Sequence, residues 1–126
     1  MVERYVLQSL RYLRNASRSI DEGNADKAGE FLWGSMAQAL KAVAESRVVA
    51  GKRLHLRSHR QIWDFVKSLT KELEDKAIYE AFIQANFLHS NFYEAELEME
   101  DVRRLAEEIR IVVDKLLSLA SKTAAN

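Results

Sequence analysis

The clearest structural signal in the chain is the segment of residues 99–121, MEDVRRLAEEIRIVVDKLLSLAS. Its aliphatic residues recur every three or four positions, which places them on one face of an α-helix. Glu100 and Asp101 come first, where acidic side chains favour the positive end of the helix dipole. The segment therefore predicts a long amphipathic helix. Its apolar stripe consists of Val102, Leu105, Ile109, Val112, Val113, Leu116 and Leu117.

Helical spacing also recurs in four earlier segments, residues 2–22, 25–49, 58–73 and 75–92. Gly23 and Asn24 separate the first two, and both residue types accept the left-handed backbone of a helix end. So short a connection predicts antiparallel neighbours. Ser58 and Gln61 fit a capping box, and residues 50–57 are expected to form a loop. No segment alternates like a strand, so we predict an all-α antiparallel bundle of about five helices.

The first two expected helices allow predictions about packing. Small residues are frequent in the second helix, and a glycine inside a helix costs about 1 kcal/mol relative to alanine. Gly29 and Gly34 therefore indicate close approach of another backbone or a ligand. Trp33 is expected in the core, with a subunit interface as the alternative. The first helix is expected to bury an apolar face that contains Val6, Leu7, Leu10, Leu13 and Ile20.

Length and composition suit one soluble domain over residues 1–126, with residues 122–126 as a frayed tail. Hydrophobic residues make up 48% and charged residues 30%, which is typical of globular proteins. Cysteine is absent, so disulfides, thiolate metal sites and a cysteine nucleophile are excluded. We expect no membrane span and no signal peptide, and hence a cytoplasmic protein.

The formal net charge is zero, but its distribution is uneven. Basic residues outnumber acidic ones in residues 1–71, and the reverse holds in residues 72–126. Two interpretations remain open: the halves pair across the bundle or between subunits, or the basic half binds an anionic ligand.

Residues 46–63 contain no acidic residue, although they include His55 and His59 and five basic residues. Free amides at a helix start attract anions, and guanidinium groups bind phosphate bidentately. Arg57, His59 and Arg60 are therefore candidate ligands for phosphate, a nucleotide or an RNA backbone. The alternative is a solvated loop that pairs with acidic residues. The five basic residues are Arg47, Lys52, Arg53, Arg57 and Arg60.

A second candidate segment is NFLHSNFYE, residues 86–94. Asn86, His89 and Tyr93 lie three and four positions apart, so on a helix they share one face. Buried polar groups need hydrogen bonds, which predicts either an internal network or a pocket. His89 can exchange protons near neutral pH, so His89 and Asn86 are candidate catalytic residues and Asn91 and Tyr93 candidate ligand contacts.

Sequence motifs for cofactors are missing. There is no phosphate loop, no dinucleotide fingerprint and no serine nucleophile turn. The histidines lack acidic or thiol partners at ligand spacing. We therefore expect neither a cofactor nor a metal.

Three blocks carry a family resemblance: EFLWGS (30–35) with ALKA (39–42), LRSHR (56–60) and ANFLHSNFYE (85–94). In this order they resemble the archaeal paREP-type proteins, a branch of the HEPN superfamily of small helical domains. The similarity covers nearly the whole chain. It implies an HEPN-like antiparallel bundle that is usually dimeric, and it implies no established biochemical role.

In catalytic HEPN proteins an arginine precedes a histidine with four to six residues between them, and the pair cleaves RNA without metal across a dimer cleft. His89 matches the histidine, but the window before it holds Phe82, Ile83 and Gln84. This departure favours a protein that is not an enzyme.

The leading hypothesis is a homodimer that binds a nucleotide or RNA near His89 and residues 57–60. One alternative is a metal-independent ribonuclease that uses His89 as acid or base, with Arg57 or Arg60 stabilising the phosphorane-like charge. The other is an interaction module for a nucleotidyltransferase-like partner, with the small-residue face of the second helix as the contact.

Overall fold

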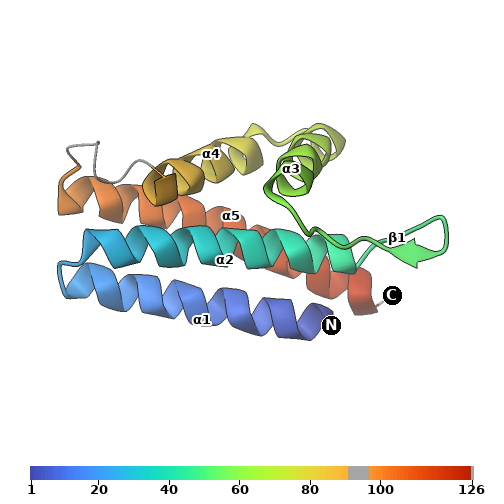
Figure 1. Ribbon diagram of the computed structural model, residues 1–126, viewed down its shortest axis with the longest axis horizontal. Coiled ribbons are helices and arrows are strands. Elements are labelled where there is room, and N and C mark those ends of the chain that lie inside the picture. Colours follow the sequence, from blue (N-terminus) through green and yellow to red (C-terminus); the bar gives the residue numbers. More distant parts are fainter. Residues whose placement is uncertain (91–96, 126) are drawn as a thin grey trace.

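The computed structural model describes residues 1–90 and 97–125. This part of the chain forms five helices and one short hairpin (Figure 1), which confirms the predicted all-α bundle. The elements are α1 (Val2–Asp21), α2 (Ala25–Glu45), β1 (Val48–Val49), β2 (Lys52–Arg53), α3 (His59–Leu73), α4 (Lys76–Ser90) and α5 (Met99–Ala125).

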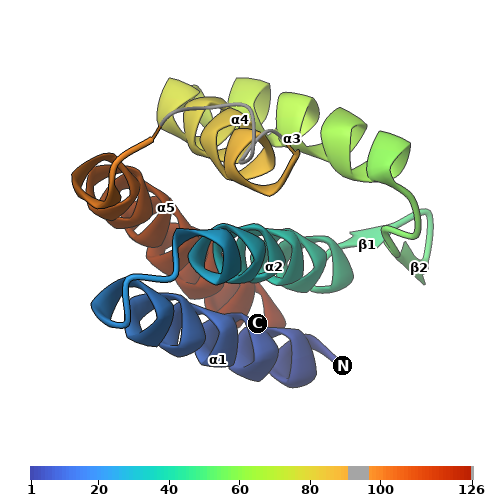
Figure 2. The ribbon, with the colours of Figure 1, turned by 60° about the vertical axis from the view of Figure 1, so that its left-hand side comes forward.

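Helix α2 lies at the centre of the bundle. Figures 1 and 2 show α1 antiparallel to α2 on one side, with α3 and α4 on the opposite side of α2. Helix α5 packs against α1, α2 and α4. Leu32, Met36 and Leu40 of α2 are almost completely buried, so this helix carries much of the core. Among the described residues, no helix is both long and apolar enough to cross a membrane.

The prediction for the buried face of α1 was wrong at two positions. Leu7 is 67% exposed and Leu10 is 39% exposed, because α1 turns Ser9 toward α2 instead. The Ser9 hydroxyl donates to the Ser35 carbonyl at 2.8 Å, and the Ser35 hydroxyl donates to the Ser9 carbonyl at 2.9 Å. This reciprocal contact of small residues holds the two helices close, and Leu7 lies on the far side of α1.

The expected close approach of another backbone to α2 is confirmed at Gly29, whereas Gly34 is approached by a side chain. A Cβ atom on Gly29 would lie 2.9 Å from the backbone oxygen of Leu88, and one on Gly34 would lie 2.9 Å from the Tyr12 ring. The other small residues of α2 are mostly buried as well. The small-residue face is therefore buried inside the bundle and does not offer the contact surface that the interaction-module alternative assigned to it.

The structure differs from expectation at the ends of α2 and α5 and in the connection between α2 and α3. Helix α2 ends at Glu45, well before residue 49, and part of the expected loop forms the hairpin of β1 and β2. Val48 pairs with Arg53 across this hairpin. Helix α5 continues to Ala125, beyond residue 121, because no glycine or proline follows to stop it. The left-handed backbone expected at Gly23 is confirmed, with φ of 73°.

Candidate functional site

Two histidines from different helices meet on one tryptophan. The His59 ring stacks on Trp33 with 5.8 Å between ring centroids and an interplanar angle of 13°. The His89 ring stacks on the same indole at 5.5 Å and 18°. Trp33 itself is only 9% exposed, which confirms its predicted place in the core, whereas both histidines are exposed. We call His59, His89 and Trp33 the Trp33 site.

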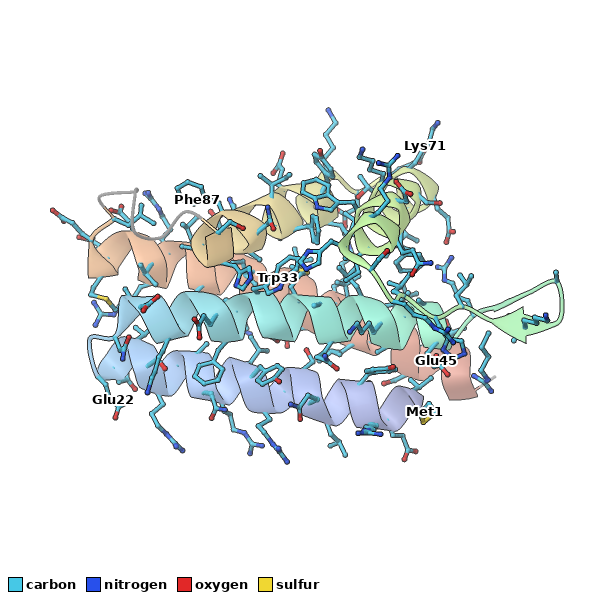
Figure 3. All side chains as sticks on the ribbon, in the orientation of Figure 1. Met1, Glu22, Trp33, Glu45, Lys71 and Phe87 are labelled. Carbon is cyan, nitrogen blue, oxygen red and sulfur yellow. The ribbon has the colours of Figure 1, made fainter. Side chains whose placement is uncertain are left out.

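Local structure explains why the two imidazoles converge. His59 is the first residue of α3, directly after the Ser58 N-cap, and His89 lies in the last turn of α4. The contact between Gly29 and Leu88 brings that last turn against α2. Figure 3 shows Trp33 pointing from α2 toward the side on which α3 and α4 lie. The start of α3 and the end of α4 therefore both contact the Trp33 side chain.

The Trp33 indole also packs against a buried aromatic ring of the core. The fully buried Phe82 ring lies 5.4 Å from the Trp33 ring and 4.8 Å from the Trp63 ring, in an edge-to-face arrangement with Trp63. Tyr79 contacts Trp63 at 6.3 Å between centroids. Aromatic pairs in such geometries add about 0.5–1.5 kcal/mol beyond area burial. Trp33 is therefore a rigid support for the two imidazoles.

The predicted capping box at the start of α3 is present with one change. Ser58 Oγ accepts a hydrogen bond from the backbone N–H of Gln61 at 3.1 Å. The Gln61 side chain, however, accepts from the backbone N–H of Arg57 at 2.6 Å, one residue before the predicted donor. This second bond fixes the backbone of Arg57 next to His59.

The basic residues of 46–63 do not form one surface. Arg47 binds Glu72 bidentately at 2.7 and 2.8 Å, and these hydrogen bonds raise the pKa of Arg47 and lower the pKa of Glu72. His55 Nδ1 lies 2.7 Å from the buried Glu45 carboxylate. Among the described residues, the interpretation that this segment pairs with the acidic half therefore applies to Arg47 alone.

Two arginines lie within two positions of His59 in the chain. The Arg60 Nε lies 3.4 Å from Asp64 in an exposed pair, which is weak in water. The exposed guanidinium of Arg57 has no carboxylate partner within the described residues. Arg57 is thus the cation beside His59 that is available to an anion.

The remaining predicted site residues have different outcomes. Asn86 is half-buried on α4, one turn before His89. Asn91 and Tyr93 lie outside the described residues. Trp33 was missed as a site residue. A tryptophan among small helical residues indicates a core position, but the sequence does not show which side chains stack on its ring. In the described part of the chain, no three His, Asp or Glu side chains cluster to hold a metal.

Comparisons with known proteins agree with the fold. The sequence matches the model of the archaeal PaREP1/PaREP8 family over residues 4–113. The structure is similar to the crystal structure of a Sulfolobus solfataricus protein, with a TM-score of 0.69 and 22% identity. That alignment covers 92% of this chain and 95% of the other; at this identity it shows the fold alone. No curated protein matches the sequence.

Proposed function

We propose that this chain, which belongs to the archaeal PaREP1/PaREP8 family, binds an anionic ligand, a nucleotide or RNA, at the Trp33 site. The observation that carries the proposal is the stacking of His59 and His89 on one indole. Two exposed imidazoles that are held by separate helices on a buried aromatic ring are preorganised polar groups. Preorganisation lowers the cost of ordering side chains when a ligand binds.

Charge supports an anion as the ligand. Arg57 lies next to the start of α3, where the helix dipole also favours negative charge. A guanidinium without a carboxylate partner can bind a phosphate group bidentately. Arg60 contributes in the same region once its weak pair with Asp64 exchanges. Asn91 and Tyr93, which follow His89 in the chain, stay predicted ligand contacts.

The test uses Trp33 as its own reporter. In a Trp63→Phe variant, Trp33 is the only tryptophan, and its fluorescence is followed during titration with AMP, ATP and a mixed-sequence RNA. We expect a saturable change with at least one of these probes. Substitution of His89→Ala or Arg57→Gln should weaken binding about tenfold or more, because hydrogen bonds to charged groups contribute roughly 1.5–3 kcal/mol.

The matched control is Arg18→Gln, which removes the same charge from α1 on the opposite side of α2 (Figure 1). It should leave the affinity for AMP or ATP unchanged. No saturable signal with any probe, or equal weakening by Arg57→Gln and Arg18→Gln, would overturn the proposal.

A second candidate is metal-independent RNA cleavage. The observation that favours it is that the site contains two imidazoles, so one can act as base and the other as acid. One imidazole would take the proton of the ribose 2′-hydroxyl, whose oxygen attacks phosphorus; the other would protonate the departing 5′-oxygen. Arg57 would stabilise the charge on the phosphoryl oxygens. The products are a 2′,3′-cyclic phosphate and a 5′-hydroxyl end.

This candidate is tested with mixed-sequence RNA and a chelator, beside His59→Ala and His89→Ala variants. Cleavage by the parent protein that both substitutions abolish would support it. The absence of arginine from residues 82–84 departs from the catalytic HEPN pattern. Equal background cleavage in all three samples would reject this candidate, and ligand binding would remain as the proposed function.

A further inference from the structure

Two separate surfaces of the molecule include exposed aliphatic side chains. The first, the α1 face, consists of Leu7, Leu10, Arg11 and Arg14, and its two leucines are 67% and 39% exposed. The second, the α4–α5 groove, is a hollow of about 340 Å³ between those helices. Its edge includes Ile111, which is 57% exposed. The groove is lined by Ala77, Glu80, Ala81, Gln84, Glu108, Ile111 and Val112.

The α1 face is basic. All basic residues of α1 are arginines, and none of them has an ion pair in the described part of the chain. Arg11 and Arg14 lie one turn beyond Leu7 and Leu10, respectively, so the guanidinium groups border the two leucines. Arginine is enriched in protein interfaces, whereas lysine is depleted. The face therefore combines apolar contact area with unpaired positive charge.

The α4–α5 groove has the opposite charge. Glu80 and Glu108 border it, and neither has a cationic partner among the residues that the structure describes. The Glu108 carboxylate accepts one hydrogen bond, from the Gln84 amide at 2.9 Å. The alanines on the floor leave room for an incoming aliphatic side chain. The groove is thus an apolar hollow with an acidic border.

We infer that the α1 face of one copy docks into the α4–α5 groove of a second copy. Leu7 and Leu10 contact the alanines and Ile111, while Arg11 and Arg14 lie against Glu80 and Glu108. Neither surface pairs well with itself, because two α1 faces would oppose arginines and two grooves would oppose glutamates. The contact is therefore heterologous, joining two different surfaces. It does not depend on the ligand proposed above.

The geometry of the fold makes this self-association head-to-tail. Figure 2 shows α1 and α4 on opposite sides of α2, so one chain does not bring its own two surfaces together. Each dimer keeps one unused α1 face and one unused groove. The predicted homodimer is thereby the smallest member of a series that grows with protein concentration, and rising salt weakens it by screening the charged borders.

The test is sedimentation velocity on the full chain at about 100 μM and several salt concentrations. The parent protein should form dimers and larger species that dissociate on dilution. Leu7→Glu blocks the α1 face, and Ile111→Arg blocks the groove. Each should raise the dissociation constant more than tenfold, because burial of one aliphatic side chain contributes about 1.5–3 kcal/mol. Each variant alone should therefore need more than tenfold higher concentrations than the parent to associate.

Mixing the two variants distinguishes this contact from a symmetric dimer. Leu7→Glu keeps an intact groove and Ile111→Arg keeps an intact α1 face, so an equal mixture should form a dimer and nothing larger. Val48→Glu, which replaces another exposed aliphatic residue (62% exposed) outside both surfaces, should assemble like the parent. Far-UV circular dichroism checks folding, and Leu10→Glu replaces Leu7→Glu if the latter unfolds. A monomeric parent protein, or a mixture that stays monomeric, would overturn the inference.

Discussion

Gly29 controls how closely the end of α4 approaches α2. Its missing side chain leaves room for the Leu88 backbone oxygen, which would otherwise meet a Cβ atom at 2.9 Å. Because that oxygen belongs to helix backbone, it cannot move away as a flexible side chain can. His89 is the next residue along α4, so its position depends on the absence of a side chain at Gly29.

We predict that Gly29→Ala destabilises the protein by about 1–3 kcal/mol, the usual range for overpacking, and that it weakens nucleotide binding by displacing His89. The measurements are urea unfolding and the Trp33 fluorescence titration. Gly34→Ala is the matched control, because its Cβ would meet the Tyr12 ring on the α1 side. It should reduce stability without changing affinity. Equal effects of both substitutions on affinity would contradict the role of Gly29.

At this scale, sequence reasoning recovered the polar half of the site. His59 was predicted because it lies in a basic segment at a helix start, and His89 because it shares a helix face with other polar residues and can exchange protons near neutral pH. Trp33 was not, because stacking partners come from tertiary packing and have no signature in spacing. Leu7 and Leu10 were assigned to the core for a related reason. Helical periodicity cannot tell which face of α1 the Ser9 contact with Ser35 turns inward.

Two turns carry backbone strain that a single substitution can relieve. Glu74, the C-cap residue that follows α3, has a left-handed backbone with φ of 50°. A side chain in this conformation costs roughly 1–2 kcal/mol, and glycine avoids the cost. The hairpin between β1 and β2 turns through Ala50 and Gly51, with φ of 53° and 79°. Two successive positive φ values are typical of the tightest hairpin turns, which favour Asn-Gly.

We predict that Glu74→Gly stabilises the protein by up to about 1 kcal/mol, because the strain in the folded state outweighs the added freedom of the unfolded chain. Thermal unfolding at neutral pH measures the change. Glu74→Ala is the control and should give little gain, since alanine keeps the Cβ atom. A lower melting temperature for the glycine variant would show that the Glu74 side chain contributes more than its backbone strain costs.

We also predict that Ala50→Asn stabilises the hairpin, because asparagine tolerates a left-handed backbone better than alanine does. The gain should be a few tenths of a kcal/mol and is best measured as slower amide exchange in the hairpin. Ala50→Val should accelerate exchange, since a β-branched residue resists positive φ. Unchanged exchange in both variants would contradict this account of the turn.

Helices were more predictable than the hairpin because they contain their signals locally. The Ser58 cap, Gly23 and the apolar stripe of α5 each mark an element within a few residues. The hairpin lacks the usual Asn-Gly or Asp-Gly signal, since Ala50 occupies its first turn position. Its strands have only two residues each, too few for an alternating pattern. Such an element is found only once tertiary contacts place it.

Across the whole molecule, ion pairs join segments that are far apart in sequence. Arg47, just after α2, binds Glu72 of α3. Lys115 of α5 binds Asp75, the residue before α4. The Asp75 carboxylate also accepts a hydrogen bond from the Ala77 backbone N–H at 3.0 Å, so it satisfies a free amide at the start of α4. These contacts make the connection between α3 and α4 sensitive to protonation of two carboxyl groups.

The direction of the pH effect follows from the pKa shifts. The hydrogen bond from Lys115 lowers the pKa of Asp75, and the hydrogen bond from Arg47 lowers the pKa of Glu72. In the unfolded chain these groups titrate near pH 4. A group whose pKa is lower in the folded state stabilises that state fully above its unfolded pKa. This contribution to the free energy of unfolding is lost as the pH falls through the folded pKa.

We therefore predict that the free energy of unfolding falls as the pH drops below about 5, and that Asp75→Asn makes the fall shallower. The variant should be less stable than the parent at pH 7, and the difference should shrink as the pH falls through the lowered folded pKa of Asp75 and the parent carboxylate becomes protonated. Urea unfolding across this pH range measures both curves. Lys115→Gln, which removes the other partner, should likewise differ more from the parent at pH 7 than at low pH. A constant difference between Asp75→Asn and the parent at every pH would contradict the assignment, because it would mean that the charge on Asp75 does not stabilise the fold.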